Sequence, residues 1–300
     1  MFDASDLSHS FDCAGRRLIL DRPRIMGVLN VTPDSFSDGG RLGDLDEALR
    51  RALQMVEEGA DIIDVGGEST RPGAAMVSVQ EELDRVVPVI ERLVAESAVP
   101  ISIDTSKPEV MRAAVAAGAG LINDVWALRR EGALAAAADL GVPVCLMHMQ
   151  GEPDTMQQAP LYDDVCAEVQ RFLADRVFTC ELAGIPRARI LADPGFGFGK
   201  TLAHNAQLMS GLAQLADSLP PLLVGVSRKA MIGEITGRGL PDRTVGSVVA
   251  AVLAAQRGAR ILRVHDVAAT RDGLAVLQAL PQRTLSPSVR SVAPRWGDED

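Results

Sequence analysis

The residues best suited to chemistry are polar side chains that follow short apolar segments of the chain. They are Asn30, Asp104, Asn123, Asp193, Lys229, Arg263 and His265. Carboxylates accept strong, directional hydrogen bonds from paired N–H groups, and a guanidinium binds an anion through two parallel bonds. We recognise no Ser/His/Asp or Cys/His set that would supply a nucleophile. These residue types therefore favour a site that binds a polar, partly anionic small molecule.

The segments that carry these residues have the character of buried strands. Each is short and rich in Val, Ile and Leu, as expected of strands covered on both faces. The eight segments are residues 24–30, 60–67, 99–105, 119–125, 142–149, 188–195, 221–228 and 259–266. Amphipathic stretches such as LDEALRRALQMVEEGA separate them, and many of these end in Gly. The alternation predicts a (β/α)₈ TIM barrel, whose strand ends meet at one mouth; an open doubly wound sheet is the alternative.

The chain divides into one large unit with two short extensions. Residues 1–23 form an N-terminal extension in which FDCAGRRLILD, around Gly15, predicts a small hairpin covering the bottom of the barrel. Residues 24–280 form the barrel. Residues 281–300 are rich in Pro and Ser and end in acidic residues, so we expect a flexible tail there.

The composition excludes several classes of function. The 300 residues carry 30 basic and 40 acidic side chains, a net charge of −10, which argues against nucleic acid and anionic membranes as partners. The four cysteines form no C-x-x-C pair, so neither a disulfide framework nor structural zinc is expected. We expect no signal peptide in the first residues and no membrane span, and therefore a cytoplasmic protein.

Three patterns have simpler explanations than catalysis. DPGFGFGKT (193–201) looks like a phosphate-binding loop, but Pro194 replaces the first Gly and the spacing is one residue short. The four histidines lack the spacing of metal ligands, which argues against a histidine-held metal. Thr105 or Ser106 could simply cap the helix that follows.

The chain resembles the dihydropteroate synthase family from about Arg24 to Leu280. The segments that carry the resemblance are MGVLNVTPDSFSDGG, DVGGESTRPGA, SIDTSKPEV, LINDV, CLMHMQGEPDTMQ, DPGFGFGK, VGVSRKAMIG and RVHDV. The resemblance implies a (β/α)₈ barrel that is usually a homodimer. It also implies condensation of 6-hydroxymethyl-7,8-dihydropterin diphosphate with 4-aminobenzoate, releasing diphosphate with Mg²⁺ present.

The same resemblance assigns the pterin contacts. A pterin presents adjacent N–H donors and one carbonyl, which two carboxylates, an amide and a lysine can match. The implied pterin readers are Asp104, Asn123, Asp193 and Lys229, with Met147 and Phe198 packed against the ring. Asp193 could instead cap a turn before Pro194, Lys229 could be a solvated lysine at a helix start, and Met147 and Phe198 could be core residues.

The remaining roles concern the diphosphate, the metal and the second substrate. Arg263 and His265 alternate along a strand end, so both can face one phosphate group. The resemblance implies Asn30 as the Mg²⁺ ligand, Thr70 near both substrates, Arg71 as a further substrate-binding residue of the same loop, and Ser227 near the benzoate carboxylate. It gives the catalytic roles to Asp104, Lys229, Arg263 and His265.

The reaction that these residues favour begins with ionisation of the pterin. Arg263, His265 and the metal would stabilise the departing diphosphate, and the neutral arylamine would need no dedicated base. Loops 31–42, with Asp34 and Phe36, and 67–78 would exclude water. We expect Arg263→Ala mainly to weaken the binding of diphosphate. A pterin-dependent methyltransferase and a non-catalytic pterin-binding paralogue are the alternatives.

Overall fold

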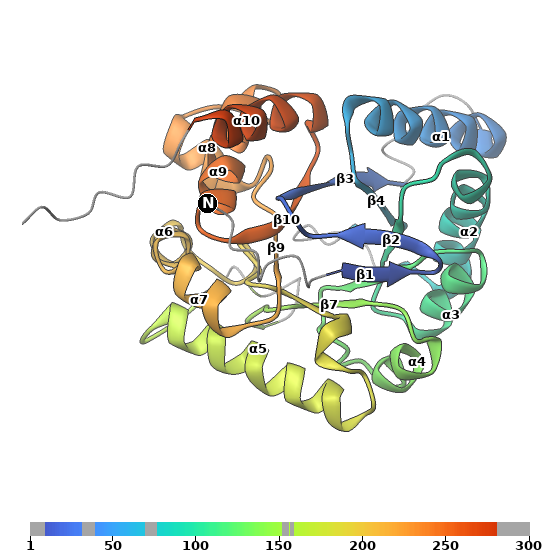
Figure 1. The fold of residues 1–300 in the computed structure, drawn as a ribbon, viewed down its shortest axis with the longest axis horizontal. Coiled ribbons are helices and arrows are strands. Elements are labelled where there is room, and N and C mark those ends of the chain that lie inside the picture. Colours follow the sequence, from blue (N-terminus) through green and yellow to red (C-terminus); the bar gives the residue numbers. More distant parts are fainter. Residues whose placement is uncertain (1–9, 32–39, 70–76, 152–155, 157–158, 281–300) are drawn as a thin grey trace, which may run out of the picture.

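Eight parallel strands close into a barrel in the computed structural model, which describes residues 10–31, 40–69, 77–151, 156 and 159–280 (Figure 1). The strands are β3 (Arg24–Asn30), β4 (Ile62–Gly66), β5 (Ile101–Asp104), β6 (Leu121–Asp124), β7 (Val144–Met147), β8 (Ile190–Asp193), β9 (Leu222–Val224) and β10 (Ala259–Val264). Strand β10 pairs with both β3 and β9, so the sheet has no open edge. The predicted barrel is therefore confirmed, and the open-sheet alternative is wrong.

Helices surround the barrel and cover its outer face (Figure 1). They are α1 (Gly40–Glu58), α2 (Val79–Glu96), α3 (Pro108–Ala116), α4 (Ala133–Leu140), α5 (Val165–Leu182), α6 (Leu202–Ser210), α7 (Leu212–Ser218), α8 (Ala230–Thr236), α9 (Thr244–Gln256) and α10 (Val267–Ala279). Their apolar faces and the outward side chains of the strands form the main hydrophobic core. This burial supplies most of the favourable free energy that holds the helices on the barrel.

Side-chain caps mark the starts of some of the helices. Ser78 and Glu81 form a reciprocal capping box at α2, and Asp164 accepts two backbone N–H bonds at α5. The cap expected of Thr105 or Ser106 is absent at α3, because that helix starts one residue later, with Lys107 as its N-cap. Thr105 instead accepts the Lys107 N–H through its hydroxyl at 3.3 Å.

A two-stranded hairpin closes the end of the barrel where the strands begin, as predicted. Strands β1 (Ser10–Cys13) and β2 (Arg16–Ile19) cross the centre of the ring of helices in Figure 1. Phe11, Cys13 and Leu18 pack with inward side chains from the N-terminal parts of the barrel strands, including Met26 and Ile62. The hairpin thus seals one end, and the polar residues must use the other.

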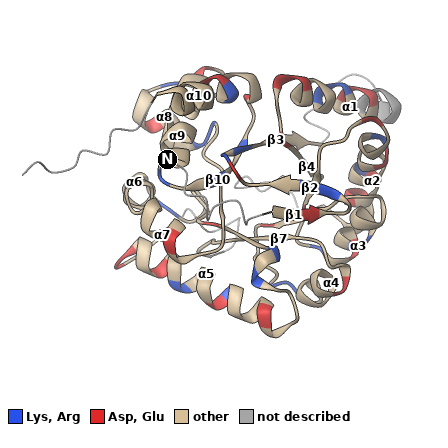
Figure 2. Cartoon of the chain, viewed as in Figure 1, with Lys and Arg blue, Asp and Glu red and all other residues tan. Residues whose placement is uncertain are grey.

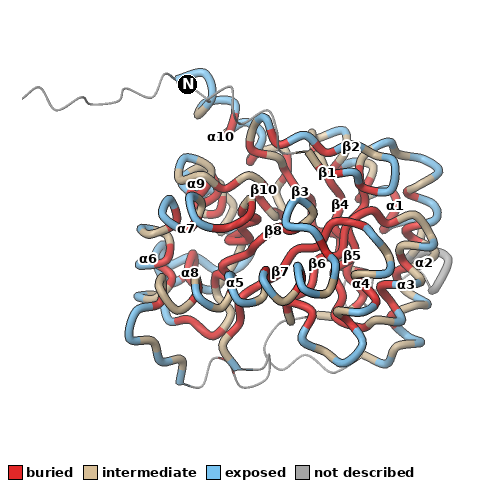
Figure 3. The backbone as a smooth tube through the Cα atoms, turned by 60° about the horizontal axis from the view of Figure 1, so that its bottom comes forward, coloured by how far each residue is buried: buried red, intermediate tan, exposed pale blue. Residues whose placement is uncertain are grey.

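Charged residues and buried residues lie in different layers of the fold, the helices outside and the strands inside. Lys, Arg, Asp and Glu lie mainly on the outer helices and loops (Figure 2), whereas the strands are almost continuously buried (Figure 3). Within the described ranges, no helix is long and apolar enough to span a membrane. Because the strands are buried, a charged side chain that enters the barrel needs an opposite charge or a hydrogen-bond partner there.

Candidate active site

The carboxyl ends of four neighbouring strands place three predicted residues in one row. In the sheet register, Asn30 of β3 stands beside Gly66, Gly66 beside Asp104, and Asp104 beside Asn123. The missing side chain of Gly66 leaves space here, since a Cβ at Gly66 would lie 3.7 Å from Asp104 Oδ2 and 3.8 Å from Asn30 Oδ1. The two amides and the carboxylate therefore face a common mouth.

Arg263 crosses this mouth and joins two of the carboxylates. Its Nε donates to Asp64 Oδ2 at 2.6 Å, and its Nη2 donates to Asp104 Oδ2 at 2.6 Å. Asp64 also accepts a bond from Asn123 Nδ2 at 3.2 Å and is fully buried. Burial raises the pKa of Asp104 to about 7, and the Arg263 guanidinium opposes that rise. Four side chains from four strands thus form one hydrogen-bonded network.

The carboxylate of Asp64 was not among the predicted site residues. It lies in the middle of β4 rather than at its end, and it holds both Arg263 and Asn123 in position. An acidic residue between apolar neighbours, in IIDV (62–65), was the available signal. Charged residues are almost never fully buried without a partner.

Lys229 and Asp193 form the other half of the mouth. The Lys229 ammonium donates to the Phe196 carbonyl and lies 4.6 Å from the centre of the Phe198 ring. Asp193, at the end of β8, accepts the Gly195 N–H at 2.7 Å, so it caps a turn as the alternative interpretation proposed. Burial lowers the pKa of Lys229 to about 8, while Asp193 partly restores it, and burial raises the pKa of Asp193. The lysine is therefore directed into the fold rather than solvated.

The two halves meet at Gly225. A Cβ placed there would lie 3.7 Å from the Cβ of Arg263 and 3.9 Å from Lys229 Nζ. The chain turns sharply after this point, with Arg228 in the left-handed region at φ 58°. Arg228 pairs outward with Asp266, Nε to Oδ2 at 3.0 Å, so consecutive cations point in different directions. Lys229 is the one that is directed towards the mouth.

Ser227 and His265 lie side by side at the ends of neighbouring strands. The Ser227 hydroxyl oxygen is 3.0 Å from His265 Nδ1 and also accepts the His265 backbone N–H at 3.2 Å. The sequence placed these residues at different substrates, the benzoate for Ser227 and the diphosphate for His265. In the structure the two side chains share a hydrogen bond, so they lie together at one position on the rim.

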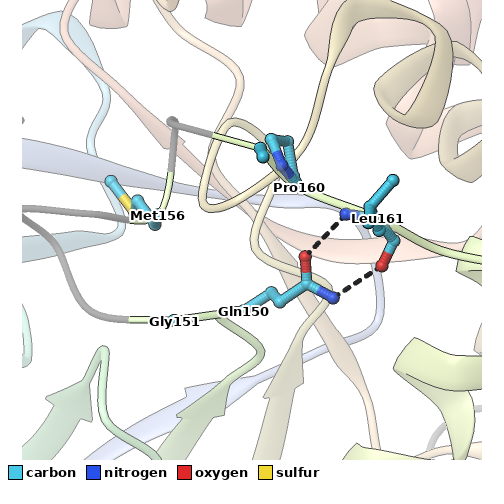
Figure 4. A pocket seen from close by; sticks show the side chains of 6 residues that line it. Gln150, Gly151, Met156, Pro160 and Leu161 are labelled. Atoms are coloured by element: carbon cyan, nitrogen blue, oxygen red, sulfur yellow. Dashed lines mark hydrogen bonds between the residues drawn. The ribbon is translucent and has the colours of Figure 1, made fainter.

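An apolar wall flanks the polar groups. Met147, at the end of β7, packs with Val125, Met149 and Met156, and Phe198 lies against this cluster. Next to it is a cavity of about 300 Å³, in which the Gln150 side chain is bonded to both backbone groups of Leu161 (Figure 4). A flat ring could rest on a wall of this kind, since thioethers and aromatic rings make favourable contacts.

Some of the predicted residues lie outside the described ranges. These are Thr70 and Arg71, the greater part of loop 31–42 with Asp34 and Phe36, and the C-terminal tail. The segment that contains Thr70 is bounded by Glu68, whose carboxylate accepts the Val77 N–H at 3.0 Å and the Lys107 ammonium at 2.8 Å. Lys107 also binds the buried Glu82 at 2.5 Å. This ion cluster is a second feature that the sequence did not reveal.

His148, one of the four histidines that lack the spacing of metal ligands, follows β7 directly and is a buried neutral ring. Its Nδ1 lies 2.9 Å from Lys200 Nζ, and burial, followed by the charge of Lys200, lowers its pKa to about 2. Rejection of a phosphate-binding loop over residues 193–201 is consistent with this, because Lys200 is buried and bonded inside the fold.

We expect His148 to make the protein acid-sensitive. Below about pH 6.5 the unfolded chain protonates this histidine and the native state does not, so the free energy of unfolding falls by about 1.4 kcal/mol per pH unit. Urea unfolding of wild type between pH 7 and 5 should therefore lose ~2 kcal/mol more than unfolding of His148→Gln does. Equal losses in the two proteins would show that His148 titrates normally.

A family model described as "Pterin binding enzyme" matches residues 26–265. The chain therefore belongs to the family of pterin-binding enzymes. Its relatives are dihydropteroate synthases: that of Escherichia coli K12 is 55% identical over 265 residues, which is 88% of this chain and 94% of that protein.

Solved structures agree with the sequence comparison. The Xanthomonas albilineans dihydropteroate synthase with 4-aminobenzoic acid has a TM-score of 0.86 and 62% identity, covering 91% of this chain and 100% of that one. The same enzyme in complex with 7,8-dihydropteroate has a TM-score of 0.83 and 59% identity, with the same coverage. The Yersinia pestis enzyme with a sulfonamide drug complex has a TM-score of 0.86 and 52% identity, covering 90% and 98%.

Proposed function

We propose that this chain is a dihydropteroate synthase that condenses 6-hydroxymethyl-7,8-dihydropterin diphosphate with 4-aminobenzoate. The observation that carries the proposal is the network at one mouth, in which Arg263 joins Asp64 and Asp104 while Lys229 stands beside Asp193. Neighbouring carboxylates, an amide and a lysine fit the hydrogen-bonding edge of a pterin. The relatives named above support the same activity.

The reaction exchanges one bond at the exocyclic methylene of the pterin. The C–O bond to diphosphate breaks with its electron pair, the arylamine nitrogen forms a C–N bond, and the nitrogen then loses one proton. Asp193, Asn123 and Lys229 hold and orient the ring. Arg263 and His265 lie where negative charge develops on the leaving group, so their contribution is electrostatic.

The donors at the mouth fit Mg²⁺ as a partner of the substrate. No cluster of three His, Cys, Asp or Glu side chains suited to a metal occurs within the described part of the chain. Mg²⁺ nevertheless binds through one or two protein oxygens together with phosphates and water. Asn30, whose Oδ1 faces the space beside Gly66, would supply such an oxygen. When bound, the ion would neutralise charge on the diphosphate.

A homodimer and a cytoplasmic location complete the proposal. Val245, Val249 and Leu253 form an exposed apolar stripe on α9, and Val276 on α10 and Leu280, directly after that helix, add to the exposed apolar surface. Apolar patches of this kind mark interaction surfaces, and we propose a second copy of the chain as the partner. The four cysteines are free, which is consistent with a reducing compartment.

One incubation tests the activity directly. The purified protein with both substrates and Mg²⁺ should produce 7,8-dihydropteroate and diphosphate, measured by mass spectrometry and a coupled phosphate assay. Binding of the pterin diphosphate without product would favour a non-catalytic paralogue. Methyl transfer from a methylated folate, with no use of 4-aminobenzoate, would favour the methyltransferase.

A further inference from the structure

The turn after β8 is shaped by glycines that no other residue can replace without strain. Gly195, Gly197 and Gly199 have φ values of +68°, +80° and +60°. A Cβ on Gly195 would lie 1.8 Å from the His148 carbonyl oxygen, and one on Gly199 would lie 2.5 Å from that of Gln150. The turn (residues 195–199) therefore packs directly on the chain that continues β7.

This turn contacts the groups to which we assign the pterin. The Gly195 N–H donates to Asp193 Oδ1 at 2.7 Å, the Phe196 carbonyl accepts from Lys229, and the Phe198 ring lies 4.6 Å from Lys229 Nζ. A shift of the turn would move the carboxylate, the ammonium and the ring together. Its conformation therefore decides the shape of the pterin pocket.

Lys200 binds the backbone of the turn from its buried side. Its ammonium is buried and makes three bonds, to the Gly195 carbonyl at 2.9 Å, the Phe198 carbonyl at 3.0 Å and His148 Nδ1 at 2.9 Å. His148 remains neutral, so its Nδ1 can accept from the ammonium, and its ring is fixed edge-on against Phe172. Three acceptors satisfy the three donors of the ammonium, which leaves none for a ligand.

We propose that Lys200, supported by His148, is a positioning residue that fixes turn 195–199 and thereby sets the affinity of the pterin pocket. The proposal rests on the proposed function, since it assigns Asp193, Lys229 and Phe198 to the pterin. It also gives a role to the lysine of GFGFGK that differs from phosphate binding. Lys200 acts through the backbone of the turn and does not touch the substrate.

Binding of two pterins to Lys200→Met separates the possible roles. The probes are 6-hydroxymethyl-7,8-dihydropterin, which has no phosphate, and its diphosphate, measured by calorimetry. Both affinities should fall by the same factor, at least about tenfold, because small misplacements of binding groups are costly. The KM for 4-aminobenzoate should stay within about twofold, since its site is not built on the turn.

A cation from the other end of the barrel is the matched control. Arg16 also donates to two backbone carbonyls, Val99 at 2.8 Å and Val94 at 2.8 Å, but it belongs to the hairpin. Arg16→Met should lower the melting temperature and leave both pterin affinities unchanged. His148→Phe removes one of the three bonds of Lys200 and should weaken both pterins in the same direction as Lys200→Met.

The outcomes distinguish failure of this proposal from failure of the proposed function. Loss of affinity for the diphosphate alone would make Lys200 a phosphate ligand and overturn the proposal. Unchanged pterin affinities, or equal loss for 4-aminobenzoate, would reduce Lys200 to a general stabiliser. If the folded wild type binds neither pterin, the proposed function itself is wrong.

Discussion

Lys229→Met is expected to lower kcat/KM for the pterin diphosphate by about 10²–10³-fold while the protein stays folded. Hydrogen bonds to charged groups contribute about 1.5–3 kcal/mol each, and the ammonium is placed to make more than one with the pterin. The loss also removes the cation that most strongly opposes the raised pKa of Asp193, so this carboxyl becomes a poorer acceptor. Steady-state kinetics with thermal melting as a check on folding would measure the effect.

The neighbouring cation provides the control for this variant. Arg228 occupies the adjacent position but pairs with Asp266, so Arg228→Met should change kcat/KM far less than Lys229→Met does. In the wild type, burial lowers the pKa of Lys229 to about 8, and kcat/KM should therefore decline above that pH as the ammonium loses its proton. Near-normal turnover in Lys229→Met would show that the pterin pocket lies elsewhere. A rate that is constant up to about pH 10 would show instead that Lys229 keeps its proton in the active enzyme.

Arg263→Met is expected to cause two separate losses, one of activity and one of stability. Sequence alone predicted mainly weaker binding of diphosphate. The structure adds that Arg263 neutralises Asp64, which is fully buried, and Asp104. Removing one partner of a buried ion pair costs about 3–5 kcal/mol, because a buried charge is left uncompensated. Chemical unfolding and kinetics measured on the same preparation would reveal both effects.

A double variant separates these two losses. Combining Arg263→Met with Asp64→Asn removes one of the two carboxylates that lose their cation, the fully buried one, and the amide oxygen introduced by the second substitution can still accept from Asn123. At least about 1 kcal/mol of the lost stability should return, since the penalty belongs to the unpaired carboxylate. Activity should not return, because the cation that faces the leaving group is still missing. Recovery of activity together with stability would mean that Arg263 serves only to hold the fold.

The sequence by itself determined the order of the elements and the rim on which the polar residues stand. Every predicted strand contains an observed one, and the first, Arg24–Asn30, agrees at both ends. The agreement has a local cause, because continuous apolar segments and helices that end in Gly are recognised from residues that are close together in the sequence. Strand β9 was predicted as residues 221–228 but ends at Val224, since the chain turns away towards Lys229.

Only the tertiary structure decided which side chains meet. Arg263 binds Asp64 and Asp104, from which it is separated by 199 and 159 residues, and the buried His148 pairs with Lys200 across 52 residues. Such pairs depend on the closure and register of the barrel, which bring together strands that carry no mutual signal in the sequence. A polar residue at a strand end is visible in the sequence, but a buried charge inside a strand is understood only when its partner is known. The physical reason is that burying a charge is unfavourable unless the folded chain supplies an opposite charge or hydrogen-bond partners within contact distance.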